Sequence, residues 1–214
     1  MKLEFEIRSA DRGDTRFLAW VIQEAARSHL EFGITDFMLP GARQRIDFLD
    51  AMLRTPTRSL FHFSRFLVAE TDGRPVAALS GYEGAGPYDL MDTSMDEAWA
   101  DLGRPAPELE EVQARLHSIL GALPDSPDDR WIVEFVATLP EFRGHGVVSR
   151  LIEEVLDKGR EQGFRKTQIS CFMGNVKAQR VYERAGFEVV EERRDPDWEA
   201  AMGCPGIVRM QMDL

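Results

Sequence analysis

The chain has 214 residues and a formal net charge of −11, and its 43% hydrophobic and 29% charged residues are ordinary for a globular protein. This acidity argues against nucleic acid as a partner, because phosphate neutralisation needs a basic face, and favours cationic partners. No apolar run approaches the ~20 residues of a membrane span, the two cysteines stand in no metal-ligand spacing, and the N-terminus lacks the apolar core of a signal peptide. We therefore expect a cytoplasmic protein with no membrane partner, no metal and no disulfide framework.

The first 83 residues predict strands, two helices and a hairpin. Alternating and helical apolar spacings place strands over 4–9, 65–70 and 75–83, and helices from Asp11 or Asp14 to about Ser28 and over 41–53. Asp72 and Gly73 separate the last two strands, and an Asp-Gly pair favours a tight hairpin turn. An antiparallel pair of strands is expected there.

An acidic segment over 84–129 follows, with eleven acidic residues against the two bases Arg104 and Arg115. Helical spacing over 91–102 and 107–120 predicts a helical insertion within one domain that spans 1–214. Its charge is consistent with a solvated face or with a surface for a cationic acceptor.

The remaining chain alternates strands and helices. We expect strands over 131–139, 164–172, 187–192 and 207–212, helices from Gly146 or Val147 to Gln162 and from Asn175 to Ala185, and a loop over 195–206. Two βα units in succession predict a parallel pair of strands with helices packed on them.

The joint between the strand at 131–139 and its helix has the sequence Arg143-Gly144-His145-Gly146-Val147-Val148. The two glycines permit positive φ, and the unpaired N–H groups of the helix start suit an anion such as a diphosphate. A purely structural turn fits as well. A Walker A loop and a dinucleotide fingerprint are excluded, because no Lys follows either glycine and Ser149 stands where the third Gly or Ala is needed.

Two motifs resemble those of the GNAT (Gcn5-related N-acetyltransferase) superfamily. Residues 139–147 are similar to its acyl-CoA loop, Arg/Gln-x-x-Gly-x-Gly/Ala, with Arg143 and Gly146 at the matching positions. About 30 residues later, Asn175, Ala178, Tyr182 and the Gly186-Phe187 pair resemble the second CoA motif. The resemblance implies an α/β fold with a mixed, mostly antiparallel central sheet flanked by helices, here with the acidic helical insertion.

The resemblance also implies an acyl-CoA-dependent N-acetyltransferase that moves an acetyl group from acetyl-CoA to a primary amine of a small molecule or peptide by direct attack. The residues implied in acetyl-CoA binding are Val136, Thr138, Arg143, Gly144, His145, Gly146, Val147, Val148, Ser149, Asn175, Ala178 and Tyr182. Backbone groups near Val136 and Thr138 would face the thioester where their strand splays from the strand at 164–172. Val148 departs from the family's Gly or Ala, and its side chain is expected to point toward the diphosphate.

Two residues are implied in catalysis. Tyr182 is the candidate proton donor to the departing thiolate, or otherwise an ordinary half-buried aromatic. Glu134 is the sole acid of its strand and the candidate general base, acting directly or through water; a structural Glu is an equal alternative, although an ionisable group in a buried strand needs a partner or a function. His29 is interpreted as a surface histidine that could line the acceptor site, and Cys171 as a core residue.

Two other classes of function remain open at this stage. One is a non-catalytic acyl-CoA-binding sensor or interaction module, and the other is an acidic interaction module that binds no CoA. The sequence leaves the acceptor amine and the oligomeric state open, a homodimer included.

Overall fold

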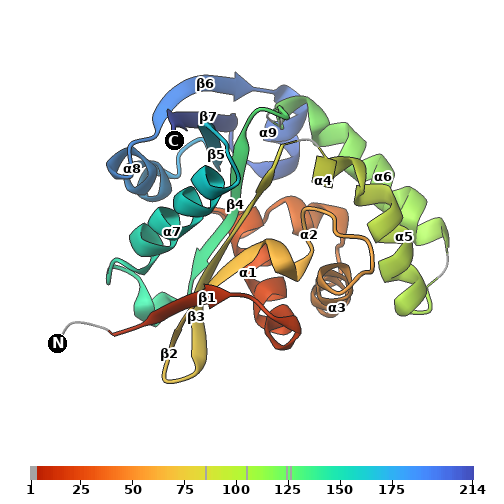
Figure 1. Ribbon diagram of the computed structural model, residues 1–214. Helices are drawn as coiled ribbons and strands as arrows, with labels where there is room; N and C mark the ends of the chain where they lie inside the picture. The colour runs from red at the N-terminus through yellow and green to blue at the C-terminus, as the bar shows by residue number, and fades with distance from the viewer. Residues whose placement is uncertain (1–3, 85, 105, 124, 126) are drawn as a thin grey trace.

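The computed structural model of the protein describes residues 4–84, 86–104, 106–123, 125 and 127–214. A seven-stranded sheet with the order β1-β2-β3-β4-β5-β7-β6 runs through it, and helices cover both faces (Figure 1). The strands are β1 Glu6–Ser9, β2 Phe66–Thr71, β3 Arg74–Glu83, β4 Trp131–Thr138, β5 Lys166–Phe172, β6 Glu188–Arg194 and β7 Gly206–Asp213. Among the described strands only β4 and β5 pair in parallel, and the other neighbouring strands are antiparallel. This confirms the expected mixed, mostly antiparallel sheet.

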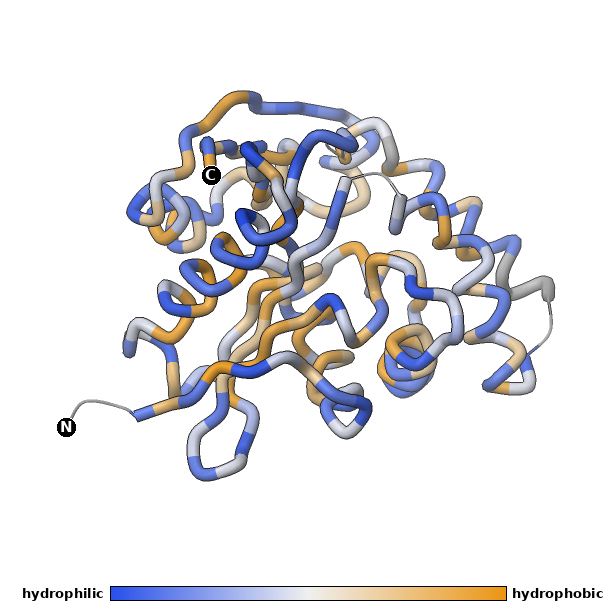
Figure 2. The backbone as a smooth tube through the Cα atoms, viewed as in Figure 1, coloured by the Kyte–Doolittle hydropathy of each residue, from blue (hydrophilic) through white to orange (hydrophobic). Residues whose placement is uncertain are grey.

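The helices form two layers around the sheet. They are α1 Thr15–Arg27, α2 Ile34–Met38, α3 Ala42–Leu53, α4 Gly86–Asp89, α5 Met91–Asp101, α6 Ala106–Ile119, α7 Val147–Glu161, α8 Val176–Arg184 and α9 Pro196–Met202. α7 packs on β2, β3 and β4, whereas α1 packs on β3 and β4 and also against α3. Figure 2 shows hydrophobic residues along the central strands and on one side of α7, and Leu151 and Ile152 on that side are fully buried. None of the described helices is both long and apolar enough to cross a membrane.

Several local predictions are confirmed by backbone geometry. Asp72 and Gly73 have φ of 50° and 72°, as a tight hairpin turn requires. Asn175 caps α8 with a side-chain hydrogen bond, and Gly163 adopts a φ of 87° after α7. The parallel pair predicted from the two βα units is β4 with β5.

The prediction of a loop over 195–206 is wrong, because this stretch contains the helix α9. The Asp195 side chain caps this helix by accepting a hydrogen bond from the Trp198 N–H at 2.9 Å, and Pro196 occupies its first turn. Trp198 is fully buried, so tertiary packing stabilises a helix too short to form alone. The loop between the first two helices likewise contains the short α2.

The acidic segment over 84–129 forms helices in its described part. α5 and α6 agree with the predicted helices to within one residue at either end; residues 85, 105, 124 and 126 lie outside the described residues. α5 packs against α3, and α6 packs against α2 and α9. α5 and α6 therefore pack on other helices, of which α3 in turn packs on α1.

Candidate active site

The predicted splay between β4 and β5 is present. Pairing between them is confined, in the described chain, to the stretch from Trp131 to Val133, although β4 continues to Thr138 along β3. The backbone edge of β4 beyond Val133 is therefore open on the β5 side. The hydroxyl oxygen of Thr138 is buried and has no hydrogen-bond partner among the described residues. An open strand edge with an unsatisfied buried oxygen suits a ligand that carries amide groups.

A β-bulge lies at the start of this open edge. The register between β3 and β4 shifts between Ala78 and Ser80, and Phe135 has a φ of 53°, a rare conformation for a bulky residue. The Phe135 ring is held by stacking on Phe61 and Phe66, with ring centroids 5.2 and 6.0 Å apart. Sequence reasoning missed the bulge, since no glycine marks it.

The loop between β4 and α7 has the geometry of an anion site. Gly144 and Gly146 have φ of 80° and 79°, and a Cβ at either position would meet open space. Glycine is thus needed for the backbone conformation, and the space above the loop is free for a ligand. Gly146 is the N-cap of α7 without a capping side chain, so the first N–H groups of the helix remain available.

Side chains around this loop are distributed between solvent and core. Arg143 donates from Nε to the Thr138 carbonyl oxygen at 3.0 Å and is otherwise exposed, as are His145 and Ser149. Val147 is buried, and Val148 is partly buried and packs against the main core. The expected direction of Val148 toward a diphosphate therefore remains a prediction.

The second motif is positioned by α8. Asn175 accepts from the Ala178 N–H at 3.1 Å and donates from Nδ2 to the Ser28 hydroxyl at 2.7 Å, which ties α8 to the end of α1. Tyr182 is 6% exposed and packs edge-on against Phe187. Burial raises the pKa of Tyr182, with a smaller contribution from Cys171. Because its pKa is raised, the phenol stays protonated at neutral pH and can donate a hydrogen bond.

Glu134 sits at the bulge and is held by two tyrosines. Its carboxylate accepts from the Tyr82 hydroxyl at 2.6 Å and from the Tyr88 hydroxyl at 3.0 Å. Burial raises the pKa of Glu134, and the two hydrogen bonds oppose this because they favour the ionised form. A carboxylate that is hydrogen-bonded and more basic than usual is suited to general-base catalysis.

Sequence reasoning missed both tyrosines. Tyr82 lies two residues beyond Ser80, the β3 partner of Glu134, so a strand alignment would have placed it on the same face. Tyr88 comes from α4 in the acidic segment, and no strand alignment would have placed it near Glu134.

The remaining candidates are not brought into this arrangement. His29 is exposed, as expected for a surface histidine, and its ring lies against Gly174. Cys171 is 8% exposed within the main core, and burial raises the pKa of its thiol to about 11. Cys171 is therefore a neutral core residue at ordinary pH. Within the described ranges, no three His, Cys, Asp or Glu side chains are grouped so as to hold a metal ion.

Comparisons with known proteins place these features in a family. Residues 38–187 match the model of the acetyltransferase (GNAT) family. The chain is 25% identical over 145 residues to the uncharacterized N-acetyltransferase YjgM of Escherichia coli, covering 66% of this chain and 82% of that protein.

Solved structures agree in fold. An N-acetyltransferase from Staphylococcus aureus Mu50 superposes with a TM-score of 0.71 at 16% identity, covering 97% of this chain and all of that one. Rv2747 from Mycobacterium tuberculosis, solved in complex with CoA, has a TM-score of 0.51 at 14% identity over 98% and 99% of the two chains. Because the family model matches more than half of the chain, the chain belongs to the acetyltransferase (GNAT) family, and it is an N-acetyltransferase.

Proposed function

We propose that this enzyme transfers an acetyl group from acetyl-CoA to a primary amine of a small molecule or peptide by direct attack. The observation that carries the proposal is the parting of β4 from β5 after Val133, directly before a loop whose glycines leave open space at the start of α7. The first feature suits the amides of a pantetheine arm and the second suits a diphosphate. The CoA complex of Rv2747 supports the same choice of co-substrate.

Glu134 would act as the general base in this reaction. Accepting a proton from the amine, directly or through water, leaves a neutral nitrogen that can bond to the thioester carbon. The raised pKa of Glu134 improves its match to an amine, and the hydroxyls of Tyr82 and Tyr88 hold the carboxylate in place. Backbone groups near Val136 and Thr138 would orient the thioester carbonyl.

Tyr182 would stabilise the sulfur as the carbon–sulfur bond breaks. A phenol has a reference pKa of ~10 and a thiol one of ~8.5, and burial raises the pKa of Tyr182 further. Complete proton transfer to the thiolate is therefore uphill, so Tyr182 contributes mainly a hydrogen bond that strengthens as charge develops on sulfur.

Two measurements test the proposal. Isothermal titration calorimetry should detect binding of acetyl-CoA, and a thiol-release assay against a panel of small amines and peptides should detect turnover with at least one acceptor. Gly146→Ala serves as the matched variant in the binding measurement. Its added Cβ contacts no other atom, but the substitution disturbs the loop conformation. Binding without release on any acceptor would indicate an acyl-CoA sensor, and absence of binding would refute the proposal altogether.

A further inference from the structure

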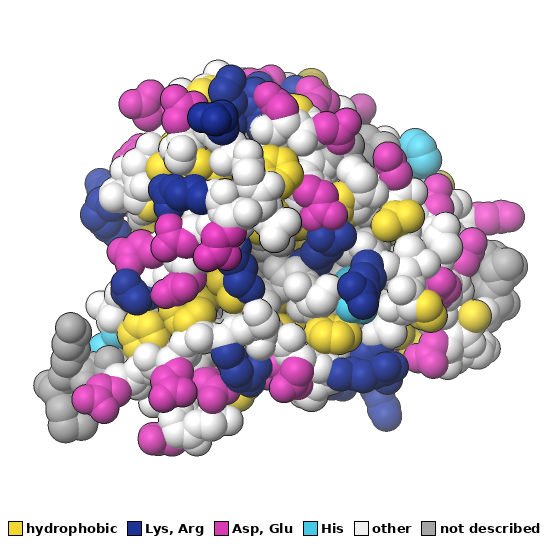
Figure 3. Space-filling model, in the orientation of Figure 1, with side chains coloured by type: hydrophobic (Ala, Val, Ile, Leu, Met, Phe, Trp, Pro, Cys, Tyr) yellow, Lys and Arg dark blue, Asp and Glu magenta, His cyan; other side chains and the backbone are white. Residues whose placement is uncertain are grey.

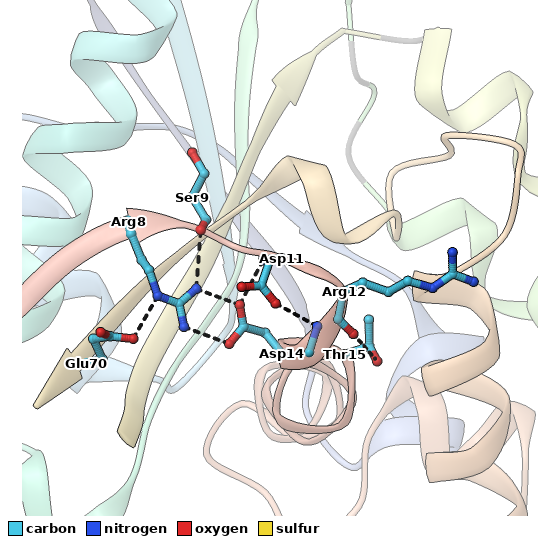
Figure 4. Close-up of polar contacts among 8 residues, drawn as sticks. Arg8, Ser9, Asp11, Arg12, Asp14, Thr15 and Glu70 are labelled. Carbon is cyan, nitrogen blue, oxygen red and sulfur yellow. Dashed lines mark hydrogen bonds and ion pairs between the residues drawn. The ribbon is translucent and has the colours of Figure 1, made fainter. Parts of the chain in front are cut away.

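Glu134 differs from two buried acids of this protein in the kind of partner it has. Asp14 is 5% exposed and accepts from Arg8 at 2.7 and 2.9 Å, as Figure 4 shows. Asp36 is 6% exposed and accepts from two nitrogens of Arg27, each at 2.8 Å. Glu134 accepts from two neutral tyrosine hydroxyls instead, and no arginine, lysine or histidine of the described chain pairs with it. The place that a cation takes beside the other acids is therefore left to a ligand.

The Glu134 carboxylate retains the capacity to bind an ammonium ion. Its Oε2 accepts from Tyr82 and its Oε1 from Tyr88, and each oxygen can accept a second hydrogen bond. The side chain is only partly buried, so a ligand can reach it. A carboxylate in apolar surroundings is stabilised by a paired cation. An ammonium ion would supply the one positive charge that this site lacks.

Apolar and aromatic side chains surround the carboxylate. Three of them are at most 3% exposed and four partly buried ones pack against these three. The set, which we call the aromatic cluster, consists of Leu60, Phe61, Tyr82, Tyr88, Met91, Ile132 and Phe135. The rings of Tyr82 and Tyr88 meet edge-on with centroids 6.2 Å apart, and those of Phe61 and Phe135 stack at 5.2 Å. A ligand bound to Glu134 would thus contact aromatic rings.

The aromatic cluster lies on the face of the sheet opposite α7. Ile132 and Glu134 are two residues apart in β4, so their side chains point to the same face. Val133 lies between them and packs in the core with Leu151 of α7, whereas Phe135 packs with residues of α1. The edge of β4 that faces β5 is open beyond Val133. An acceptor can therefore reach Glu134 from the α1 face while acetyl-CoA occupies the open edge.

The surface beside the aromatic cluster is acidic. Asp89 and Asp92 are exposed and flank Tyr88 and Met91 in sequence. Figure 3 shows acidic side chains spread over the right side of the molecule, where α5 and α6 lie in Figure 1. Such a surface attracts cationic ligands and repels anionic ones before they bind.

We propose that the acceptor is a primary arylalkylamine, which carries one ammonium group on a short chain that ends in an aromatic ring. This assignment rests on the proposed function. The ammonium group pairs with Glu134, and the ring packs against the partly buried members of the cluster, Phe61, Tyr88 and Met91. Pairs of aromatic rings gain more than the burial of their area alone. The arylalkylamine thus matches both the single charge and the rings of this site.

The same surroundings disfavour two other classes of amine. A short diamine would bury its second ammonium group among apolar side chains without a partner, and an amino acid would bring a carboxylate close to Glu134. The bound arylalkylammonium gives one proton to Glu134, and its nitrogen then bonds to the thioester carbon. The carbon–sulfur bond breaks with its electron pair on sulfur, and the second proton of the nitrogen passes to the thiolate.

Initial rates of thiol release at saturating acetyl-CoA test the acceptor class. The panel is 2-phenylethylamine, ethylamine, 1,3-diaminopropane, L-phenylalanine and phenylalanine amide, and each kcat/KM is corrected for the fraction of neutral amine. The value for 2-phenylethylamine should exceed that for ethylamine about tenfold or more, because an apolar ring is transferred from water. It should exceed the values for 1,3-diaminopropane and L-phenylalanine by a similar factor. Phenylalanine amide, which lacks the carboxylate charge, should be a better acceptor than L-phenylalanine.

Phe61→Leu should lower the ratio of kcat/KM for 2-phenylethylamine to that for ethylamine about threefold or more, because a ring-on-ring contact is lost. A merely structural role would lower both values equally. Phe17→Leu is the matched control, since Phe17 is also partly buried and stacks on Trp20 at 5.6 Å outside the aromatic cluster, and it should leave the ratio unchanged. Met91→Ala removes another part of the cluster and gives the same readout if Phe61→Leu fails to fold.

The outcomes separate this inference from the proposed function. Thiol release on none of the amines would refute the proposed function and the acceptor class with it. Thiol release in which ethylamine, 1,3-diaminopropane or L-phenylalanine equals 2-phenylethylamine would overturn the acceptor class alone. An equal change of the ratio in Phe61→Leu and Phe17→Leu would overturn it as well.

Discussion

Replacing Glu134 with Gln separates the proposed base from the structural role that the same side chain could play. Gln has nearly the same shape and keeps a side-chain oxygen for the Tyr82 hydroxyl, while its NH₂ group can donate to the Tyr88 oxygen. The two contacts at 2.6 and 3.0 Å can thus persist, with donor and acceptor exchanged in the contact to Tyr88. We expect the bulge to remain folded and only the ability of residue 134 to act as a base to be lost.

The magnitude follows from the role assigned to the carboxylate. Loss of a positioned general base lowers turnover by about 10²–10⁴, which corresponds to ~2.7–5.4 kcal/mol of activation free energy. Stability should change in the opposite direction. Burial raises the pKa of Glu134, so the ionised form is disfavoured in the folded protein at neutral pH, and a neutral Gln removes that cost. The melting temperature of Glu134→Gln should equal or exceed that of the wild type.

Steady-state thiol release over a range of pH provides the assay. The wild-type rate should fall as the pH drops through the raised pKa of Glu134, because only the carboxylate accepts a proton, and this limb should be absent in Glu134→Gln. Glu161→Gln removes the same charge from an exposed position on α7 and is the control. Unchanged turnover in Glu134→Gln, or a clear loss of melting temperature, would assign Glu134 a structural role.

Three further substitutions test the rest of the site and the cap of α9. Tyr182→Phe should lower kcat by tenfold or more and leave the Kd for CoA unchanged by calorimetry; equal losses in both would point to a packing role. Gly146→Ala should destabilise the loop by ~1–2 kcal/mol, because a φ of 79° is strained for an L-residue, and thermal denaturation with and without CoA would show it. Asp195→Ala should cost ~1 kcal/mol through loss of the α9 cap, whereas an unchanged Tm would mean that Trp198 alone holds the helix.

Much of the fold could be predicted because its signals are local. The hairpin at Asp72 and Gly73, the turn at Gly146 and the cap at Asn175 each depend on the backbone preference of one or two residues. The order of the two CoA motifs then indicated the family, and with it the splay of β4 from β5. Local chemistry and motif spacing were sufficient for the scaffold and the proposed acetyl-CoA side of the site.

The remaining features depend on contacts between distant parts of the chain. At the bulge, Phe135 combines a positive φ with a ring that stacks on Phe61 and Phe66, and no residue at the bulge encodes this by itself. The bulge sets the register that brings Tyr82 to Glu134.

The acidic segment over 84–129 contributes one residue, Tyr88, to the contacts of the candidate base Glu134. Its acids Asp92, Asp96 and Asp101 are exposed, whereas Tyr88 points inward to Glu134. Burial raises the pKa of this carboxylate, and the hydrogen bond from Tyr88, which the segment supplies, lowers it. Burial is the larger of the two influences. Loss of the Tyr88 hydrogen bond alone would therefore raise the pKa of Glu134 further.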